Sequence, residues 1–173
     1  PLAGSAADAE AIKHASERSH AVLMVGHIER FNPIMRALRQ EQAARQPILP
    51  RFIEVHRVSP MTFRSVDVGV VMDMMIHDLD VVLMLMEGRE PSEILITEHE
   101  DICNARLVWD FGPDHPGGAG RCVANVTASR LALKTERVTR ITGENAYIKI
   151  DYGAKRGTVI RRTANEIQMQ EVR

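Results

Sequence analysis

The chain opens with a helix-like pattern that leads into a short apolar run. Residues 5–19 place small apolar side chains three or four positions apart, and Ser5 followed by Asp8 signals a helix start. Residues 21–26 (AVLMVG) are continuously apolar, which is typical of a strand buried on both faces. A helix that leads into such a strand predicts half of a parallel α/β unit.

A second helix is predicted directly after this strand, behind the segment 26–33 (GHIERFNP). Asn32 can cap the helix and Pro33 suits its first turn, because the missing N–H of proline needs no partner there. The apolar face then continues to about residue 44, and prolines at positions 47 and 50 end the helix.

Strict alternation over residues 51–59 predicts a strand. Ile53, Val55 and Arg57 share one of its faces, because successive side chains of a strand point to opposite sides. The strand runs into a polar loop at residues 59–67.

The rest of the chain predicts one long helix and a series of strands. Residues 68–86 are apolar nearly all round the helix, which Gly88 and Pro91 end. Turn signals then separate seven strand-like runs, at residues 92–100, 104–111, 122–129, 137–143, 147–152, 157–163 and 166–172. We therefore predict an α+β fold, with a large, mainly antiparallel open sheet and helices on one face.

Composition narrows the class of protein. The 173 residues suit one domain, or one domain and part of another, and 22 Lys and Arg against 23 Asp and Glu leave no basic excess for nucleic-acid binding. Asp or His interrupts every apolar stretch before about 18 residues, so we expect no membrane span. Cys103 and Cys122 lie near opposite ends of a predicted hairpin, too far apart for a disulfide, so we expect reduced thiols and a cytoplasmic setting.

The candidate chemistry lies on the helix over 68–86. Asp73, His77 and Asp80 share one stripe of it, and Asp78 points about a quarter turn away. No Lys or Arg occurs between residues 65 and 86, so burial of this helix would bury an anionic cluster. Buried carboxylates need a cation or hydrogen-bond donors, so we expect Arg57, Arg64, a metal or a residue outside this chain to face them.

Two interpretations of this cluster stay open, and a third is disfavoured. His77 and Asp80 can form a structural pair while Asp78 caps a neighbouring segment. Alternatively, Asp73 lies one turn before His77, where a carboxylate can orient an imidazole as a general acid or base. A metal site needs three or four ligands, and no second His/Asp motif completes one, so we expect no metal.

The segment 26–33 and the pattern Asp-x-x-x-His-Asp-x-Asp at 73–80 together resemble the Gfo/Idh/MocA family of nicotinamide-dependent sugar oxidoreductases. The resemblance covers essentially the whole chain, and Pro1 would be the proline of the family's Glu-Lys-Pro signature. It implies that residues 1–30 are the last helix and strand of a Rossmann domain. Residues 31–173 would then form the substrate-binding and oligomerisation domain.

The resemblance also implies roles for residues of this sequence. His77 would be the general acid/base, and Asp73 would orient it or bind the sugar. Arg57, Arg64 and Asp78 are candidates for the substrate's polar groups, including a diphosphate, although a structural role competes for both arginines. Near the NAD or NADP cleft would lie Arg30, Phe31, Asn32 and Pro33.

Two features of the family are missing from this sequence. No Gly-x-Gly-x-x-Gly turn follows a strand, and the lysine that polarises the reacting hydroxyl is absent. We therefore expect a fragment that neither binds NAD tightly, in the micromolar range by calorimetry, nor turns over sugar by itself.

The branch of the family that the segments resemble most is that of enzymes acting on nucleotide sugars, such as UDP-N-acetylglucosamine 3-dehydrogenases. The implied partners are the sugar or nucleotide sugar and further copies of the chain, packed through the open face of the sheet. The alternative function is a non-catalytic oligomerisation domain whose acidic helix is structural.

Overall fold

The computed structural model describes residues 2–43, 48–62, 67–144, 146–162 and 166–173, so Pro1 and Arg64 lie outside the described residues. Its helices are α1 (Ala6–Ser19), the 3-10 helix η1 (Ile28–Phe31), α2 (Pro33–Ala43), the π-helix η2 (Val71–Met75) and α3 (Ile76–Leu85). Its strands are β1 (Pro50–Val58), β2 (Glu93–His99), β3 (Ile102–Phe111), β4 (Gly120–Ser129), β5 (Glu136–Gly143), β6 (Ala146–Asp151), β7 (Arg156–Arg162) and β8 (Ile167–Val172). All the predicted strands after residue 92 are confirmed, because alternation and turn residues mark each one.

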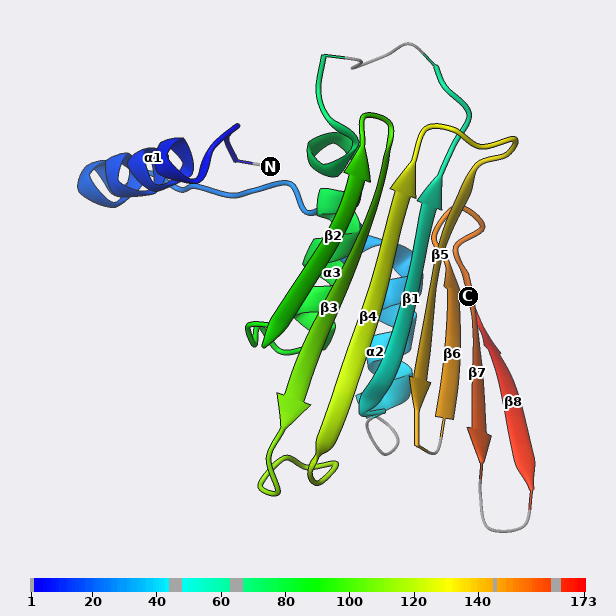
Figure 1. Cartoon of the computed structure of the whole chain (residues 1–173). Coiled ribbons are helices and arrows are strands. Elements are labelled where there is room, and N and C mark those ends of the chain that lie inside the picture. Colours follow the sequence, from blue (N-terminus) through cyan, green and yellow to red (C-terminus); the bar gives the residue numbers. More distant parts are fainter. Residues whose placement is uncertain (1, 44–47, 63–66, 145, 163–165) are drawn as a thin grey trace.

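One sheet of eight strands, in the order β2-β3-β4-β1-β5-β6-β7-β8, forms the body of the molecule (Figure 1). Neighbouring strands are antiparallel except β1 and β4, which run parallel. The long connection from β1 through η2 and α3 makes this parallel pair possible, since parallel neighbours cannot be joined by a short turn. The predicted α+β class and mainly antiparallel sheet are confirmed.

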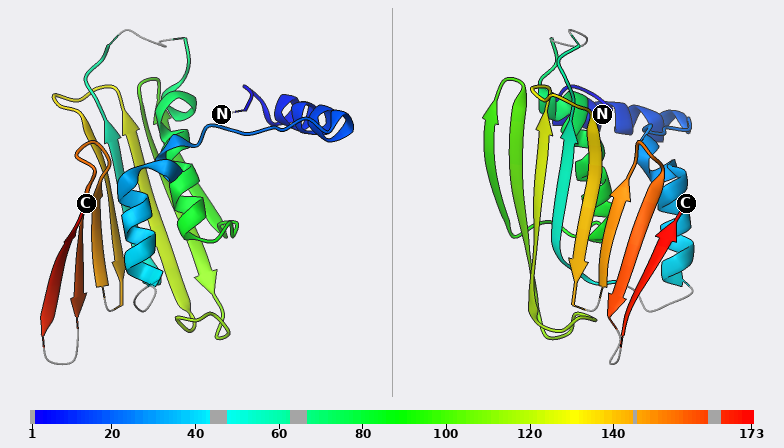
Figure 2. Two further views of the ribbon diagram at one scale, coloured as in Figure 1. Left: turned by 180° about the vertical axis from the view of Figure 1, so that it is seen from behind. Right: turned by 90° about the vertical axis from the view of Figure 1, so that its right-hand side faces the viewer.

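The helices α2 and α3 cover one face of the sheet and leave the other face uncovered (Figure 2). The core lies between these two layers, where the alternation of the strands directs their apolar side chains. Its fully buried members include Ile34 on α2, Val81 and Val82 on α3, and Ile53 and Val55 on β1. Ile53, Val55 and Arg57 share one face of β1, as predicted, and the structure makes it the inner face.

The N-terminal segment extends away from the sheet (Figures 1 and 2). The helix α1 begins as predicted, with the Ser5 side chain accepting a bond from the Asp8 backbone N–H. The predicted strand at 21–26 is wrong for the described structure, because these residues are extended but pair with no other strand. Val22 is 98% exposed and Met24 is 70% exposed, so this apolar run has no cover within the described residues.

The two cysteines are free and buried in the β3–β4 hairpin, as expected. Cys103 pairs in register with Ala128 near one end, and Cys122 pairs with Trp109 near the other. The hairpin register therefore holds the two thiols apart.

The long helix over 68–86 differs from a regular α-helix in its first turns. The segment η2 is a π-turn, and α3 follows it and ends at Leu85. Beyond this end the chain turns through a left-handed Gly88, whose φ is +72°. Neighbouring strands and helices bury only one side of α3, since Leu83 is 39% exposed while Val82 is fully buried. Apolar residues all round the helix therefore do not mean full burial in this chain.

Candidate active site

A hollow of about 460 Å³ opens at the end of the sheet where β1 ends and η2 begins. It is lined by side chains from η1, β1, the η2–α3 helix and the start of β5. Its charged and titratable lining residues are Glu29, Arg57, Asp73, His77, Arg130 and Arg137. The fold thus brings an imidazole, two carboxylates and three guanidinium groups to one depression.

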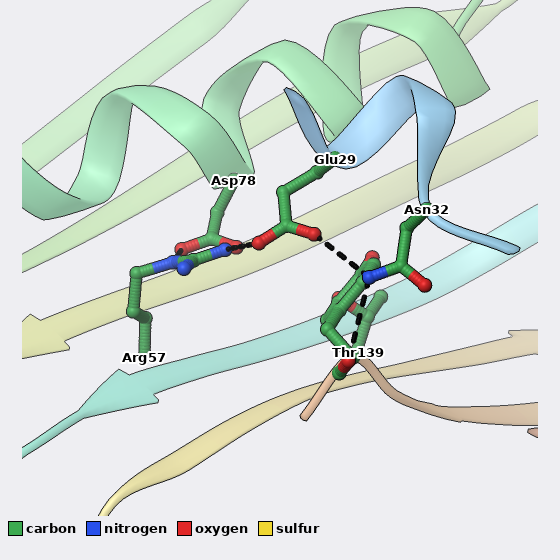
Figure 3. Close-up of polar contacts among 6 residues, drawn as sticks. Glu29, Asn32, Arg57, Asp78 and Thr139 are labelled. Atoms are coloured by element: carbon green, nitrogen blue, oxygen red, sulfur yellow. Dashed lines mark hydrogen bonds and ion pairs between the residues drawn. The ribbon is translucent and has the colours of Figure 1, made fainter. Parts of the chain in front are cut away.

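Arg57 lies in the wall of this hollow and bonds two carboxylates at once (Figure 3). Its Nε donates to Asp78 at 2.6 Å, and its terminal nitrogen donates to Asp78 and to Glu29, each at 2.9 Å. All three residues are at most 6% exposed. Burial lowers the pKa of Arg57, but the bonds from Asp78 and Glu29 raise it above its usual value.

This network gives both Arg57 and Asp78 partners within the protein. Both oxygens of Asp78 already accept bonds from Arg57, and Asp78 is 2% exposed, so direct substrate contact by Asp78 does not fit. Arg57 does supply the expected cation for the acidic helix. It neutralises Asp78, however, and not the stripe that carries His77.

His77 is half-buried and lines the hollow. Burial lowers the pKa of His77 below its usual value, and the positive charge of Arg57 lowers it further, while Asp78 and Glu29 oppose this shift. His77 is therefore mainly neutral near pH 7, which is the state a general base requires. No hydrogen-bond partner for its ring occurs among the described residues.

Asp73 faces the same hollow but does not bond to His77 in the described structure. Its carboxylate lies 3.9 Å from Arg130 Nε, and Arg130 also approaches Asp101 at 3.6 Å and donates to the Val68 carbonyl. The spacing that suggested contact with His77 assumes α-helical turns, whereas Asp73 lies in the π-turn η2. Such turns change the angle between successive side chains and are frequent at functional sites.

The predicted cofactor residues fall into two groups. Arg30 donates two bonds to Asp80, at 2.7 and 2.5 Å, and Asn32 caps α2 through the Ile34 N–H, so both hold the local fold. Phe31 is 70% exposed and Pro33 is also exposed, which leaves these two free to meet a ligand. The proposed His77–Asp80 pair is not formed, because Asp80 bonds Arg30 and approaches His27 at 3.4 Å.

Three residues of the hollow were not singled out from the sequence. Glu29 lies within the GHIERFNP segment, where it is the only acid. Arg130 and Arg137 flank the β4–β5 connection, and nothing in their local sequence predicts that they approach the long helix. They reach it because β1 lies between β4 and β5 in the sheet.

The described residues contain neither a metal-binding cluster nor a membrane-spanning helix. No group of three or more His, Cys, Asp or Glu side chains among them could hold a metal ion. No described helix is both long enough and apolar enough to cross a membrane.

No protein-family model matches this sequence. A curated relative, the UDP-N-acetylglucosamine 3-dehydrogenase of Acidithiobacillus ferrooxidans, is 33% identical over 151 residues, which are 84% of this chain and 44% of the relative. A solved structure of that name from the same organism superposes with a TM-score of 0.78 and 30% identity, over 96% of this chain and 52% of the other. The chain spans about half the length of the relatives it matches.

More distant structures share the fold. A levoglucosan dehydrogenase, solved with NADH and levoglucosan, has a TM-score of 0.75 and 18% identity, over 99% of this chain and 52% of the other. An oxidoreductase from Pseudomonas syringae has a TM-score of 0.76 at 14% identity, over 99% and 48% of the two chains. By sequence and by fold, the chain is similar to Gfo/Idh/MocA-type oxidoreductases, and the match fits their C-terminal portion.

Proposed function

We propose that this chain is the substrate domain of an NAD(P)-dependent dehydrogenase that oxidises a carbinol of a sugar, with His77 as general acid/base. The observation that carries this proposal is the half-buried His77, which lines a hollow beside three arginines and has a pKa shifted toward the neutral form. A neutral imidazole at the wall of a depression rich in polar groups suits proton exchange with a hydroxyl.

The reaction divides between the cofactor and this chain. NAD(P)⁺, when bound in the full-length protein, supplies the acceptor of the hydride. As the carbinol C–H bond breaks and its hydride leaves for the cofactor, the hydroxyl proton passes to a ring nitrogen of His77. The C–O single bond thereby becomes the C=O double bond of a ketone. Asp73, whose side chain is 35% exposed in the hollow, can accept a hydrogen bond from a neighbouring sugar hydroxyl and so orient the ring.

The residues of this chain suit only part of the cofactor: they offer surface for a flat ring but no cradle for the pyrophosphate. Ile28 lines the hollow and is 64% exposed, and Phe31 is 70% exposed, so both offer apolar surface for a flat ring. The sequence has no Gly-rich turn to cradle a pyrophosphate. We therefore propose that residues 1–30 belong to a dinucleotide domain completed by other residues, and that calorimetry finds no micromolar NAD binding by the chain alone.

We propose that the sugar carries a nucleotide diphosphate. The relative at 33% identity is named as a UDP-N-acetylglucosamine 3-dehydrogenase. In this chain Arg57 is occupied by two carboxylates, whereas Arg137 is exposed and lines the hollow near His77. Arg137 is thus the guanidinium best placed to meet a diphosphate, which arginines bind through paired hydrogen bonds.

The test is turnover by the full-length protein with each sugar class. We expect absorbance of the reduced cofactor to grow with UDP-N-acetylglucosamine and not with levoglucosan, because only the first carries a diphosphate for Arg137. Turnover with levoglucosan alone would contradict the nucleotide-sugar assignment. Absence of cofactor reduction with any sugar would contradict the dehydrogenase assignment itself.

A second proposal concerns association through the uncovered face of the sheet. A row of register partners crosses this face and is largely apolar: Val123, Phe52, Thr142, Tyr147, Ile160 and Met169. No helix covers the row (Figure 2), and extended apolar surfaces of this kind usually mark interfaces. We propose that a second copy of the chain packs here.

Light scattering behind size exclusion tests this association. We expect a dimer or larger assembly for the wild type and a shift toward monomer for Phe52→Lys, because the new charge would be buried at the interface. Arg36→Glu, on the exposed side of α2, is the matched control and should leave the assembly unchanged. A monomeric wild type would contradict the proposed packing.

A further inference from the structure

The network around Arg57 joins charged residues from three different elements. Glu29 belongs to η1, Arg57 to β1 and Asp78 to the start of α3. Asp78 directly follows His77, and Glu29 directly precedes Arg30, the first of the residues that the family resemblance places near the cofactor cleft. The guanidinium of Arg57 therefore bridges the element that carries the base and the element beside the cofactor.

Stability alone does not explain why such a network is buried. Removing two carboxylates and a guanidinium from water costs several kcal/mol per ion, and well-packed apolar residues of similar volume often serve stability equally well. What an ion network supplies instead is a fixed geometry, because each donor and acceptor accepts only a narrow range of distances and angles. The bonds of 2.6 to 2.9 Å around Arg57 impose such a geometry.

Further hydrogen bonds extend the network into the sheet (Figure 3). The second oxygen of Glu29 accepts a bond from Asn32 at 3.2 Å, and Asn32 also donates to the Tyr152 carbonyl at 3.3 Å. The Tyr152 hydroxyl in turn lies 3.1 Å from the Thr139 hydroxyl on β5. The segment 28–33 is thereby tied to α3 and to the sheet through one chain of buried and partly buried contacts.

We propose that Arg57 is a positioning residue, which holds His77 at a fixed distance from the cofactor segment 28–33 by bonding Asp78 and Glu29 at once. This inference rests on the proposed function. Arg30 and Asp80 form a second link between the same elements, but Arg30 is 43% exposed and the pair is screened by water. Arg57, which is 5% exposed, is the stiffer of the two links.

The charge of Arg57 also acts on the imidazole directly. The groups that face His77 are Arg57 from β1, Asp78 from α3, Glu29 from η1, and Asp73, Arg130 and Arg137 around the hollow. Arg57 opposes a positive charge on the ring, whereas Asp78 and Glu29 favour it. Loss of the guanidinium would therefore leave the two carboxylates to draw a proton onto His77.

Arg57→Lys in the full-length enzyme separates position from charge, because lysine keeps the charge but cannot make the paired bonds to Asp78. We expect kcat to fall about tenfold to hundredfold, as small misplacements of a catalytic group do, while the sugar KM stays within about threefold. Arg161→Lys is the matched control, since Arg161 is largely shielded from solvent, with 11% of its side chain exposed, and bonds Glu41 on α2 with two contacts of 3.2 Å. It should lower stability and leave kcat unchanged.

Arg57→Gln tests the charge through a readout that does not require turnover. In the full-length protein with isotope-labelled histidine, NMR titration should show His77 protonating at higher pH than in the wild type, and Arg161→Gln should leave it unmoved. The inference is overturned if Arg57→Lys keeps kcat within twofold, or if the His77 titration is the same in Arg57→Gln and wild type. If the wild type shows no dehydrogenase activity, the proposed function fails and the titration alone decides the inference.

Discussion

Replacing His77 by alanine in the full-length protein is expected to lower kcat by about 10²- to 10⁴-fold, the usual contribution of a positioned general acid or base. The reason is that the described hollow offers no other neutral base: its remaining titratable groups are carboxylates and guanidinium groups. Steady-state kinetics with the nucleotide sugar and NAD(P)⁺ measure the effect. The sugar KM should change far less than kcat, because His77 acts on the transferring proton.

His56→Ala is the matched control for this experiment. His56 lies on β1 one position before Arg57, but its side chain is exposed on the face of the sheet away from the hollow. Its loss should leave kcat unchanged. Equal activity of His77→Ala and wild type, with the fold intact, would favour the alternative, a non-catalytic oligomerisation domain with a structural acidic helix.

Asp78→Ala is expected to destabilise the chain by about 3 kcal/mol, because it leaves the buried guanidinium of Arg57 with Glu29 as its remaining carboxylate. Breaking a buried ion pair by removing one partner is among the costliest single changes in a protein. Urea unfolding measures the effect as a lower midpoint at constant slope.

Asp110→Ala is the control for the loss of stability expected in Asp78→Ala. Asp110 accepts a bond of 2.7 Å from Arg121, close to the 2.6 Å of the bond from Arg57 to Asp78, but both partners are more than half exposed. Water screens such a pair, so we expect no measurable change in the unfolding midpoint. If Asp78→Ala cost as little as Asp110→Ala, the network around Arg57 would not have the rigidity that we assign to it.

The sequence predicted the strands well and the sheet order not at all. Alternation and turn residues are local signals, so β1 to β8 could be located from short windows of sequence. That β1 lies between β4 and β5 is a property of the whole chain. For this reason the approach of Arg130 and Arg137 to His77 could not be predicted.

The candidate site was predicted in its residue types but only partly in its contacts. The sequence predicted a cation beside the acidic helix, because a buried carboxylate requires one, and offered Arg57, Arg64, a metal or a residue outside this chain. In the structure Arg57 bonds Asp78, which lies off the stripe that carries His77. Which carboxylate Arg57 bonds was not predictable, since the π-turn η2 changes the directions in which the side chains of this helix point. The strand at 21–26 failed because an apolar run favours a buried strand only where neighbouring strands exist to pair with it.

The most direct test of the account is a crystal structure of the full-length protein with reduced cofactor and the nucleotide sugar bound. We predict that a ring nitrogen of His77 lies within about 3.2 Å of the hydroxyl at the carbon facing the nicotinamide. Arg57 should remain bonded to Asp78 and Glu29 in that complex. A sugar bound elsewhere, or a reacting hydroxyl that meets a different side chain, would contradict the account.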